Sequence, residues 1–380
     1  MGKRNVTCPF CFNKMRVVDS VNGTFPDQYC GRCDSRIPEE SLFSELLPIA
    51  VVGPSRSGKT HFLTVMAHQL LEDVLWPSYW VSTRVIRVRR HDDYVPSSFV
   101  TSDDAFLNFE ESLYPQSGTG VILQPTDRYD KVRMPLSLVV HLTFEMPSSA
   151  FGTEPYGRRQ VLLAFTDTAG EDLTHTGWGD IVEKYPILDN GMAKAIIALI
   201  DPAELTGLRD NIVANPILER QFGEVGIELK VQTTMASVLS IPQIRKMRRI
   251  PLAVCLTKTD GLAVMKQFAD GDPIIGRENA LFGVERKPGC VNLSKIRELS
   301  DSVKRFLPMK DKDGDNKIAR VASNFRYHSF FAVDALGPAI KAVETVDGQR
   351  LMRVPPNPRR VLDPLLWILW QHGYVRGVYA

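Results

Sequence analysis

Short continuous runs of apolar residues recur along the chain, and most of them end in a polar or glycine-rich segment. The run at residues 161–165 is apolar without interruption, which is typical of a strand buried on both faces of a sheet. Similar runs predict further strands at residues 49–52, 136–144, 195–200, 252–256 and 327–333. The pattern therefore predicts a core built around buried strands.

Helical periodicity follows the first of these runs. Two adjacent rows of apolar residues spaced by four make one apolar stripe, and the rows are Phe62, Met66, Leu70, Val74 and Leu63, Ala67, Leu71, Leu75. Trp76-Pro77 ends this helix, because proline cannot continue the helical hydrogen bonding. A second strongly apolar segment, residues 362–370, predicts a helix that docks on the sheet.

The interval at residues 78–133 shows no strong period. It contains a charged stretch at residues 82–90, which predicts an edge strand, and a candidate helix at residues 102–114. Arg84, Arg87 and Arg89 recur along the charged stretch and can contact phosphate or a partner. A solvated strand face is the simpler interpretation, since charged side chains commonly occupy the outer face of an edge strand.

The composition supports a large buried core. The chain has 380 residues, 44% of them apolar, so we expect one large domain and a small one. The net charge of +2, from 46 basic and 44 acidic residues, excludes a global field that would demand nucleic acid or an anionic membrane. There is no signal-peptide core and no apolar span of membrane length, so we expect a cytoplasmic protein without a membrane partner.

Two Cys-x-x-Cys pairs lie near the N-terminus, Cys8 with Cys11 and Cys30 with Cys33, with 18 residues between the pairs. Two thiolates on a tight turn can face one ion, and two such turns complete a tetrahedral zinc site. Disulfides are disfavoured by the missing signal peptide, and a redox role by the absence of a surrounding βαβ pattern. We expect a zinc ribbon at residues 1–41, ending in a short linker near residues 38–41.

The ribbon is rich in basic residues, which makes nucleic acid a candidate partner. They are Lys3, Arg4, Lys14, Arg16, Arg32 and Arg36. A structural or protein-docking role is the simpler interpretation, and it is favoured over nucleic-acid binding.

The first apolar run leads into Gly53 and, after four further residues, into Gly58-Lys59-Thr60. Between a strand and a helix, this spacing is that of a phosphate-binding P-loop. Its backbone N–H groups and the helix N-terminus favour phosphate oxygens. Lys59 is expected to reach the β- and γ-phosphates, and the Thr60 hydroxyl to hold Mg²⁺. The expected nucleotide-binding residues of this loop are Gly53, Ser55, Arg56, Ser57, Gly58, Lys59 and Thr60.

Three later strand ends carry further nucleotide signatures. Asp167 follows the run at residues 161–165, where its carboxylate can hold Mg²⁺ opposite Thr60, and Gly170 can contact the γ-phosphate and act as a hinge. Thr257-Lys258-Thr259-Asp260 follows residues 252–256. The Asp260 carboxylate can accept from N1–H and the exocyclic amine of guanine, which adenine does not supply in the same pattern. Lys258 can lay its stem along the base, and a backbone amide near Ala335 can meet the guanine O6.

The segments at residues 53–60, 167–171, 257–260 and 333–337, in this order and each at a strand end, resemble the guanine-nucleotide motifs of the translation-factor and Ras-like (TRAFAC) class of P-loop GTPases. The resemblance covers about residues 46–337. It implies a three-layer α/β fold with a mostly parallel sheet and one antiparallel strand, here residues 136–144. The GTPase domain is expected at residues 42–380, with a long insertion at about 78–133 and a C-terminal helix at about 360–372.

The resemblance also implies catalytic roles. The first switch should supply a threonine to Mg²⁺ and the γ-phosphate; Thr126 is the choice and Thr119 the alternative. Glu171 occupies the place of a water-orienting glutamine, or is a surface residue of the second switch. Arg56 points outward to a partner or acts as an internal arginine finger. The expected catalytic set is Lys59, Thr126, Gly170 and Glu171, with Thr60, Asp167 and Thr126 as Mg²⁺ ligands.

Three functions compete at this point. The first is a GTPase switch with GTP or GDP, Mg²⁺ and Zn²⁺ as cofactors, read by a protein partner. The second is a scaffold that binds GTP, hardly hydrolyses it, and docks partners through the ribbon and insertions. The third is an ATPase in which Asp260 is incidental. The GTPase switch is the leading hypothesis. A zinc ribbon ahead of such a domain, with the apolar C-terminal segment, resembles bacterial double-GTPase proteins of signalling or conflict systems, and the resemblance implies a role of that kind.

Overall fold

The structure is a computed structural model of the 380-residue chain. It describes residues 3–18, 25–54, 57–72, 75, 81–86, 111–115, 120–121, 137–145, 158–168, 185–188, 191–205, 208, 239, 244, 246–262, 273–275, 290–309, 317–337, 343–346, 349–352 and 354–379.

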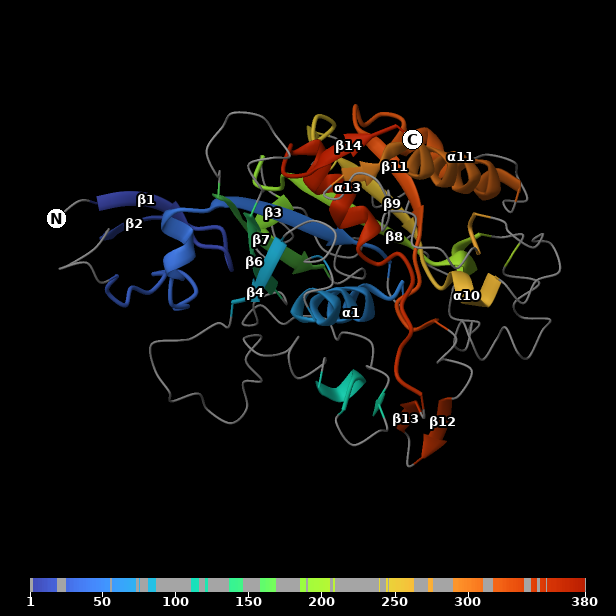
Figure 1. Cartoon of the computed structure of the whole chain (residues 1–380), viewed down its shortest axis with the longest axis horizontal. Coiled ribbons are helices and arrows are strands. Elements are labelled where there is room, and N and C mark those ends of the chain that lie inside the picture. Colours follow the sequence, from blue (N-terminus) through green and yellow to red (C-terminus); the bar gives the residue numbers. More distant parts are fainter. Residues whose placement is uncertain are drawn as a thin grey trace.

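A mostly parallel sheet forms the centre of the molecule (Figure 1). Within the described residues it has seven strands in the order β11-β9-β8-β3-β7-β6-β4. Only β6 runs antiparallel to its neighbours, β7 and β4. The strands are β3 (Glu45–Val52), β4 (Val81–Val85), β6 (Ser137–Glu145), β7 (Arg158–Asp167), β8 (Ala195–Ile200), β9 (Leu252–Leu256) and β11 (His328–Ala332).

The strand predictions from apolar runs are confirmed. β8 and β9 coincide with the predicted residues 195–200 and 252–256, and the predicted antiparallel strand at residues 136–144 is β6. β4 lies at the edge of the sheet, as its charged sequence indicates. All six residues of β8 and all five of β9 are buried, which is why their sequences show no polar alternation.

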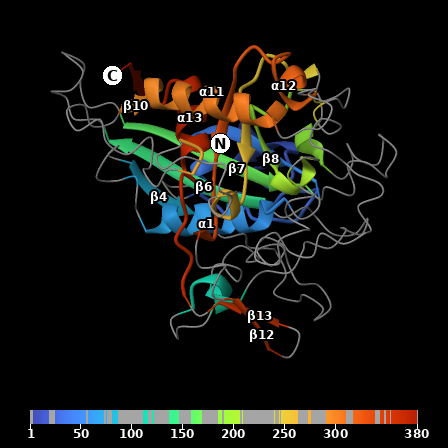
Figure 2. The ribbon, with the colours of Figure 1, turned by 90° about the vertical axis from the view of Figure 1, so that its right-hand side faces the viewer.

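Helices cover both faces of the sheet, as Figure 2 shows for α1 and α11. Alternate residues of β8 supply the two cores: Ile196 and Ala198 face one, Ile197 and Leu199 the other. In the part of the chain that the structure describes, the helices are α1 (Lys59–Leu71), α10 (Thr259–Leu262), α11 (Leu293–Met309), α12 (Lys317–Ala322) and α13 (Asp363–Gln371), with 3-10 turns η1 (Glu39–Leu42), η3 (Pro186–Leu188) and η4 (Pro202–Glu204). The sheet and its cover fit an α/β P-loop-like fold.

Among the described residues, three small sheets accompany the large one. β1 (Lys3–Thr7) and β2 (Lys14–Val18) form an antiparallel hairpin, and β10 (Cys290–Asn292) pairs in parallel with β14 (Arg376–Val378). β12 (Val343–Val346) and β13 (Gln349–Met352) pair antiparallel, and β13 also pairs with β5 (Gly120–Val121). The β12–β13 hairpin lies well away from the central sheet (Figure 1).

The N-terminal ribbon packs on the sheet face opposite α1. Phe10 and Val17 belong to the same buried cluster as Leu162 and Ala164 of β7, whereas α1 packs in the other cluster. The Ser137 hydroxyl at the start of β6 donates to the Phe10 carbonyl at 3.4 Å. The ribbon is therefore part of the cover of the sheet.

The segment near residues 38–41 was expected to be a short linker, and the structure differs there. It forms η1, in which the Glu40 side chain is buried and accepts from Arg84 of β4 at 3.0 Å. Next to it, the Ser44 hydroxyl lies 3.0 Å from Nε2 of His141 on β6. These contacts involve residues far apart in the sequence, so a local pattern could not predict them.

The apolar C-terminal segment forms α13 and docks on the sheet, which confirms the predicted helix. Trp367 packs edge-to-face on Phe331 of β11, with ring centroids 5.8 Å apart. At the first turn of α13, the Asp363 carboxyl is buried and accepts no hydrogen bond from the residues that the structure describes. Burial raises the pKa of Asp363 to about 8, against the opposing charge of Arg360, so this carboxyl is mostly protonated at neutral pH.

Candidate functional site

The parallel strands bring the predicted nucleotide motifs to one edge of the sheet. β3, β7, β8, β9 and β11 run in the same direction, so their carboxyl ends meet there. Gly53, Thr168, Asp201, Thr257 and Val333 follow these five strand ends. Because β8 lies between β3 and β9 in the sheet, Asp201 lies between the P-loop and the Thr257–Asp260 loop.

Both P-loop glycines that the sequence singled out occupy positions that disfavour a larger residue. A Cβ on Gly53 would lie 2.5 Å from the Ser57 hydroxyl oxygen and 3.0 Å from the Leu199 carbonyl oxygen. Gly58 has a φ of 86° and caps the start of α1, a left-handed conformation that glycine adopts at little cost. Gly53 therefore fits a crowded part of the loop, and Gly58 supplies its left-handed turn.

The Lys59 ammonium is folded back onto the P-loop. Its Nζ donates to the carbonyl oxygens of Gly53 at 3.0 Å and of Pro54 at 2.9 Å, and the residue is 8% exposed. A buried ammonium held by two carbonyl dipoles is a cation that a phosphate oxygen can satisfy better, because an anionic acceptor makes a stronger hydrogen bond than a carbonyl does. The position fits the predicted role of Lys59.

Thr60 and Asp167 are brought together from positions 107 residues apart. The Thr60 hydroxyl donates to Asp167 Oδ2 at 2.8 Å. The other oxygen, Oδ1, accepts no hydrogen bond from any described residue, although Asp167 is fully buried. Burial raises the pKa of Asp167, while the Lys59 charge and the Thr60 hydroxyl oppose the rise. A buried oxygen in need of a partner beside a hydroxyl is a donor set that suits Mg²⁺, so these residues fit the metal.

The end of β7 is tied to the end of β3, which fixes Asp167 beside the P-loop. Val51 pairs with Asp167 in the parallel register. The hydroxyl and the backbone N–H of Thr168 both donate to the Val51 carbonyl, at 2.9 and 3.3 Å. No local pattern assigned a role to Thr168, because its partner lies 117 residues away.

At the other end of the site, two loops are joined through a buried carboxyl. Asp334 accepts the backbone N–H of Asp260 on Oδ2 at 3.2 Å and that of Gly337 on Oδ1 at 2.9 Å. Burial raises the pKa of Asp334, and these hydrogen bonds partly offset the rise. Asp334 therefore links the predicted base-recognition residue Asp260 to the loop that carries Ala335. The sequence had assigned no separate role to Asp334.

A C-terminal segment at residues 357–359 is hydrogen-bonded to the loop at residues 334–337. Asp334 and Arg359 exchange backbone hydrogen bonds at 3.0 and 2.8 Å, and the Asn357 N–H donates to the Leu336 carbonyl. Gly337 has a φ of 63°, and a Cβ there would lie 2.1 Å from the Asn357 carbonyl oxygen. No local sequence signal marks this clamp, because it depends on pairing between separate segments.

Several predicted site residues lie outside the described residues. They are Ser55, Arg56, Thr119, Thr126, Gly170 and Glu171. The structure therefore brings together Gly53, Lys59, Thr60 and Asp167 at one end of the site. At the other end it brings together Thr257, Lys258 and Asp260, and the proposed switch residues stay predictions.

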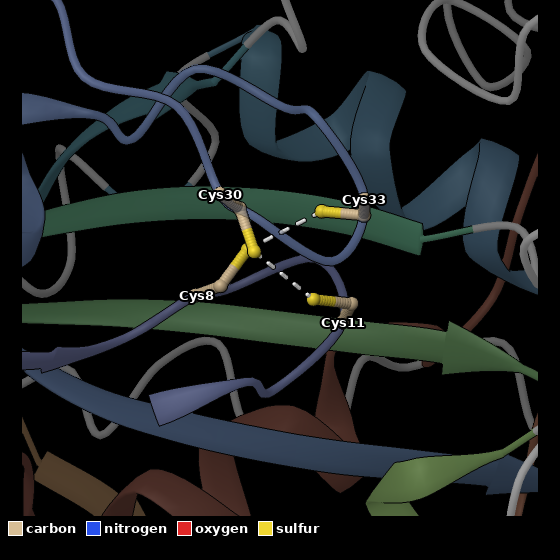
Figure 3. Close-up of side chains that lie close together, drawn as sticks. All are labelled: Cys8, Cys11, Cys30 and Cys33. Carbon is tan, nitrogen blue, oxygen red and sulfur yellow. Dashed lines mark hydrogen bonds between the residues drawn. The ribbon is translucent and has the colours of Figure 1, made fainter. Parts of the chain in front are cut away.

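The four N-terminal cysteines converge on one point (Figure 3). Sγ of Cys8 and Cys33 lie 3.7 Å apart, those of Cys11 and Cys30 lie 3.5 Å apart, and all four sulfurs are within 4.8 Å of one another. Zn–S bonds of about 2.3 Å in a tetrahedron place sulfurs about 3.8 Å apart. All four are free thiols. The cluster fits a zinc ribbon.

Matching turns build the two halves of this cluster. Phe12 N–H donates to the Cys8 carbonyl and Asp34 N–H to the Cys30 carbonyl, at 2.9 and 2.8 Å. Phe12 and Asp34 both have positive φ, 59° and 55°. Each Cys-x-x-Cys pair thus lies in the same kind of turn, which points both of its thiols inward.

The four thiols perturb one another strongly. Interaction with Cys11 raises the pKa of Cys8, and the contact with Cys11 lowers that of Cys30. So many sulfurs in one buried place cannot all be thiolates unless a cation compensates their charge. This chemistry supports the zinc assignment independently of the sequence spacing.

A scan against protein-family models finds no match, and a search of curated proteins finds none either. Among solved structures, the chain is similar to the signal recognition particle receptor SRb-GTP/SRX complex from Chaetomium thermophilum, at 14% identity. The superposition covers 78% of this chain and 93% of that chain, with a TM-score of 0.29. A likeness this loose carries no functional argument, so function rests on the residues of this chain.

Within the described part of the chain, no helix combines the length and the apolar character that crossing a membrane requires.

Proposed function

We propose that this chain is a GTP-binding protein that hydrolyses GTP to GDP and phosphate as a Mg²⁺-dependent conformational switch. The observation that carries the proposal is the buried contact between Thr60 of the P-loop helix and Asp167 at the end of β7, next to the folded-back Lys59. Such a group of one cation, one hydroxyl and one orphaned carboxylate oxygen suits a nucleoside triphosphate with its metal.

The chain's own groups do the following. Lys59 exchanges the carbonyls of Gly53 and Pro54 for oxygens of the β- and γ-phosphates, and the P-loop amides stabilise charge on the transferring phosphoryl group. Thr60 and Asp167 hold the metal site. Bound Mg²⁺ would neutralise phosphate charge there. At the base, Asp260 accepts the two N–H groups of guanine that adenine lacks in this arrangement.

The switch itself is proposed for the segments around Thr126 and Gly170. GTP orders both, and loss of the γ-phosphate releases them. Glu171 is the candidate for orienting the attacking water, and Arg56 the candidate for an internal arginine finger. An unidentified protein partner would bind differently to the GTP-bound and GDP-bound conformations. A protein is favoured over nucleic acid as this partner. The cellular role proposed is a cytoplasmic one in bacterial signalling or conflict, as the resemblance of the motif set suggests.

Single-turnover hydrolysis of GTP and of ATP by zinc-replete protein with Mg²⁺ tests this proposal. We expect GTP to be cleaved and ATP to be cleaved at least roughly a hundredfold more slowly, because adenine does not offer the Asp260 carboxylate the two N–H groups that guanine offers. Lys59→Ala should abolish the turnover, and this loss would show that the hydrolysis comes from this protein and not from a contaminant. The rate of Glu171→Gln shows whether the Glu171 carboxylate orients the attacking water. Tight GTP binding without turnover would contradict the switch and favour the scaffold; ATP preference would favour the ATPase.

A further inference from the structure

Asp201 lies directly after β8, between the two ends of the nucleotide site, and the nucleotide roles proposed above do not include it. The residue is 7% exposed. Its Oδ1 accepts a hydrogen bond from the backbone N–H of Ala203 at 2.9 Å, and its Oδ2 accepts one from Nζ of Lys258 at 2.6 Å. One oxygen is thus fixed by the local backbone, while the other holds the ammonium group of a residue in the predicted base-recognition loop.

The end of β8 also holds the backbone of that loop. The N–H and the hydroxyl of Thr257 both donate to the Ile200 carbonyl at 2.9 Å. Lys258 follows with a φ of 53°, a left-handed conformation that residues other than glycine rarely adopt. Ile200 and Asp201 therefore fix the backbone and the side chain of Lys258 together.

The ion pair determines the conformation of the Lys258 side chain before a ligand binds. A free lysine samples many rotamers, and ordering it on binding costs entropy. Here the ammonium is already held by Asp201, and the side chain is 22% exposed, so part of it is accessible to a ligand. A stem ordered in advance can pack on a planar base without that cost, which is how preorganisation raises affinity.

We propose that Asp201 is a positioning residue for guanine recognition, which acts by holding Lys258 in the conformation that packs on the base. The inference rests on the proposed function, because it requires a guanine nucleotide at this edge of the sheet. Asp201 itself does not touch the nucleotide. Its effect passes through the ammonium of Lys258.

Asp201→Asn tests the proposal, because asparagine keeps Oδ1 for the Ala203 N–H but puts an amide donor opposite the ammonium. We expect the affinity for GTP and GDP to fall roughly tenfold, the scale of one charge-assisted hydrogen bond, and the preference for GTP over ATP to fall with it. Glu40→Gln is the matched control. It breaks the partly buried ion pair with Arg84 beside the ribbon and should leave nucleotide affinity unchanged.

A double-mutant cycle with Lys258→Ala separates positioning from general structure. If Asp201 acts through Lys258, Asp201→Asn has no further effect on GTP affinity once Lys258 is alanine. An equal loss in both backgrounds, or unchanged GTP affinity in Asp201→Asn, would overturn the inference while leaving the proposed function intact. Failure of the wild-type protein to bind any guanine nucleotide would overturn the proposed function itself, and this inference with it.

Discussion

Replacing Asp260 by Asn will weaken GTP binding by roughly a hundredfold or more and make xanthosine triphosphate the preferred nucleotide. The carboxylate accepts two N–H groups of guanine, and hydrogen bonds to a charged group contribute about 1.5–3 kcal/mol each. Asparagine presents one donor in place of an acceptor, which mismatches guanine and matches the additional carbonyl of xanthine. The variant therefore gains affinity for xanthosine triphosphate. A variant that had only lost its fold would not gain affinity for any nucleotide.

Competition for a fluorescent guanine nucleotide measures this change. The fold should persist in Asp260→Asn, because the variant keeps the backbone N–H of residue 260 that Asp334 accepts. Asp301→Asn, an exposed substitution on α11, is the control and should keep the wild-type preference. Unchanged selectivity in Asp260→Asn would show that the base is read elsewhere.

Removing zinc will destabilise the sheet as well as the ribbon. The metal's binding free energy is folding free energy for so small a unit, about 10–16 kcal/mol in isolated zinc-finger peptides. Phe10 and Val17 of the ribbon belong to the same buried cluster as Leu162 and Ala164 of β7, so loss of the ribbon removes part of the cover of that sheet face. We expect Cys11→Ser, or a strong chelator, to lower the melting temperature by roughly 10 °C, the shift that several kcal/mol produces in a chain of this size.

Zinc content by metal analysis, paired with thermal unfolding, checks this prediction. Cys290→Ser is the matched control, since Cys290 is a half-buried cysteine on β10 outside the cluster. It should keep one zinc per chain and the wild-type melting temperature. Protein purified without zinc, or Cys11→Ser melting like wild type, would contradict the structural role of the metal.

The elements that the sequence predicted well are those whose signal is local. Residues 195–200 and 252–256 match β8 and β9 because strands buried on both faces must be apolar throughout. The cysteine spacing likewise predicted the cluster that the structure brings together. Gly53 lies where a Cβ would be crowded and Gly58 has a left-handed backbone conformation, so the P-loop pattern and its geometry agree.

The features that the sequence missed depend on contacts between distant residues. The sequence pattern placed Asp201 only in the turn after a strand. Its proposed role depends on its contact with Lys258, which lies 57 positions later. Asp334 gains its role from the N–H of Asp260, and its loop is held by Asn357 and Arg359. The packing of the ribbon on β7 has the same origin. Such contacts are properties of the folded topology and leave no periodic trace in the chain.

Equilibrium binding of GTP and GDP, compared with ATP and ADP, to zinc-replete wild-type protein in Mg²⁺ tests the central claim most directly. The account predicts that guanine nucleotides bind at least roughly a hundredfold tighter than adenine nucleotides, and that Lys59→Ala abolishes this binding. Equal affinity for the two bases, or binding that survives in Lys59→Ala, would contradict a guanine-nucleotide site built on this P-loop.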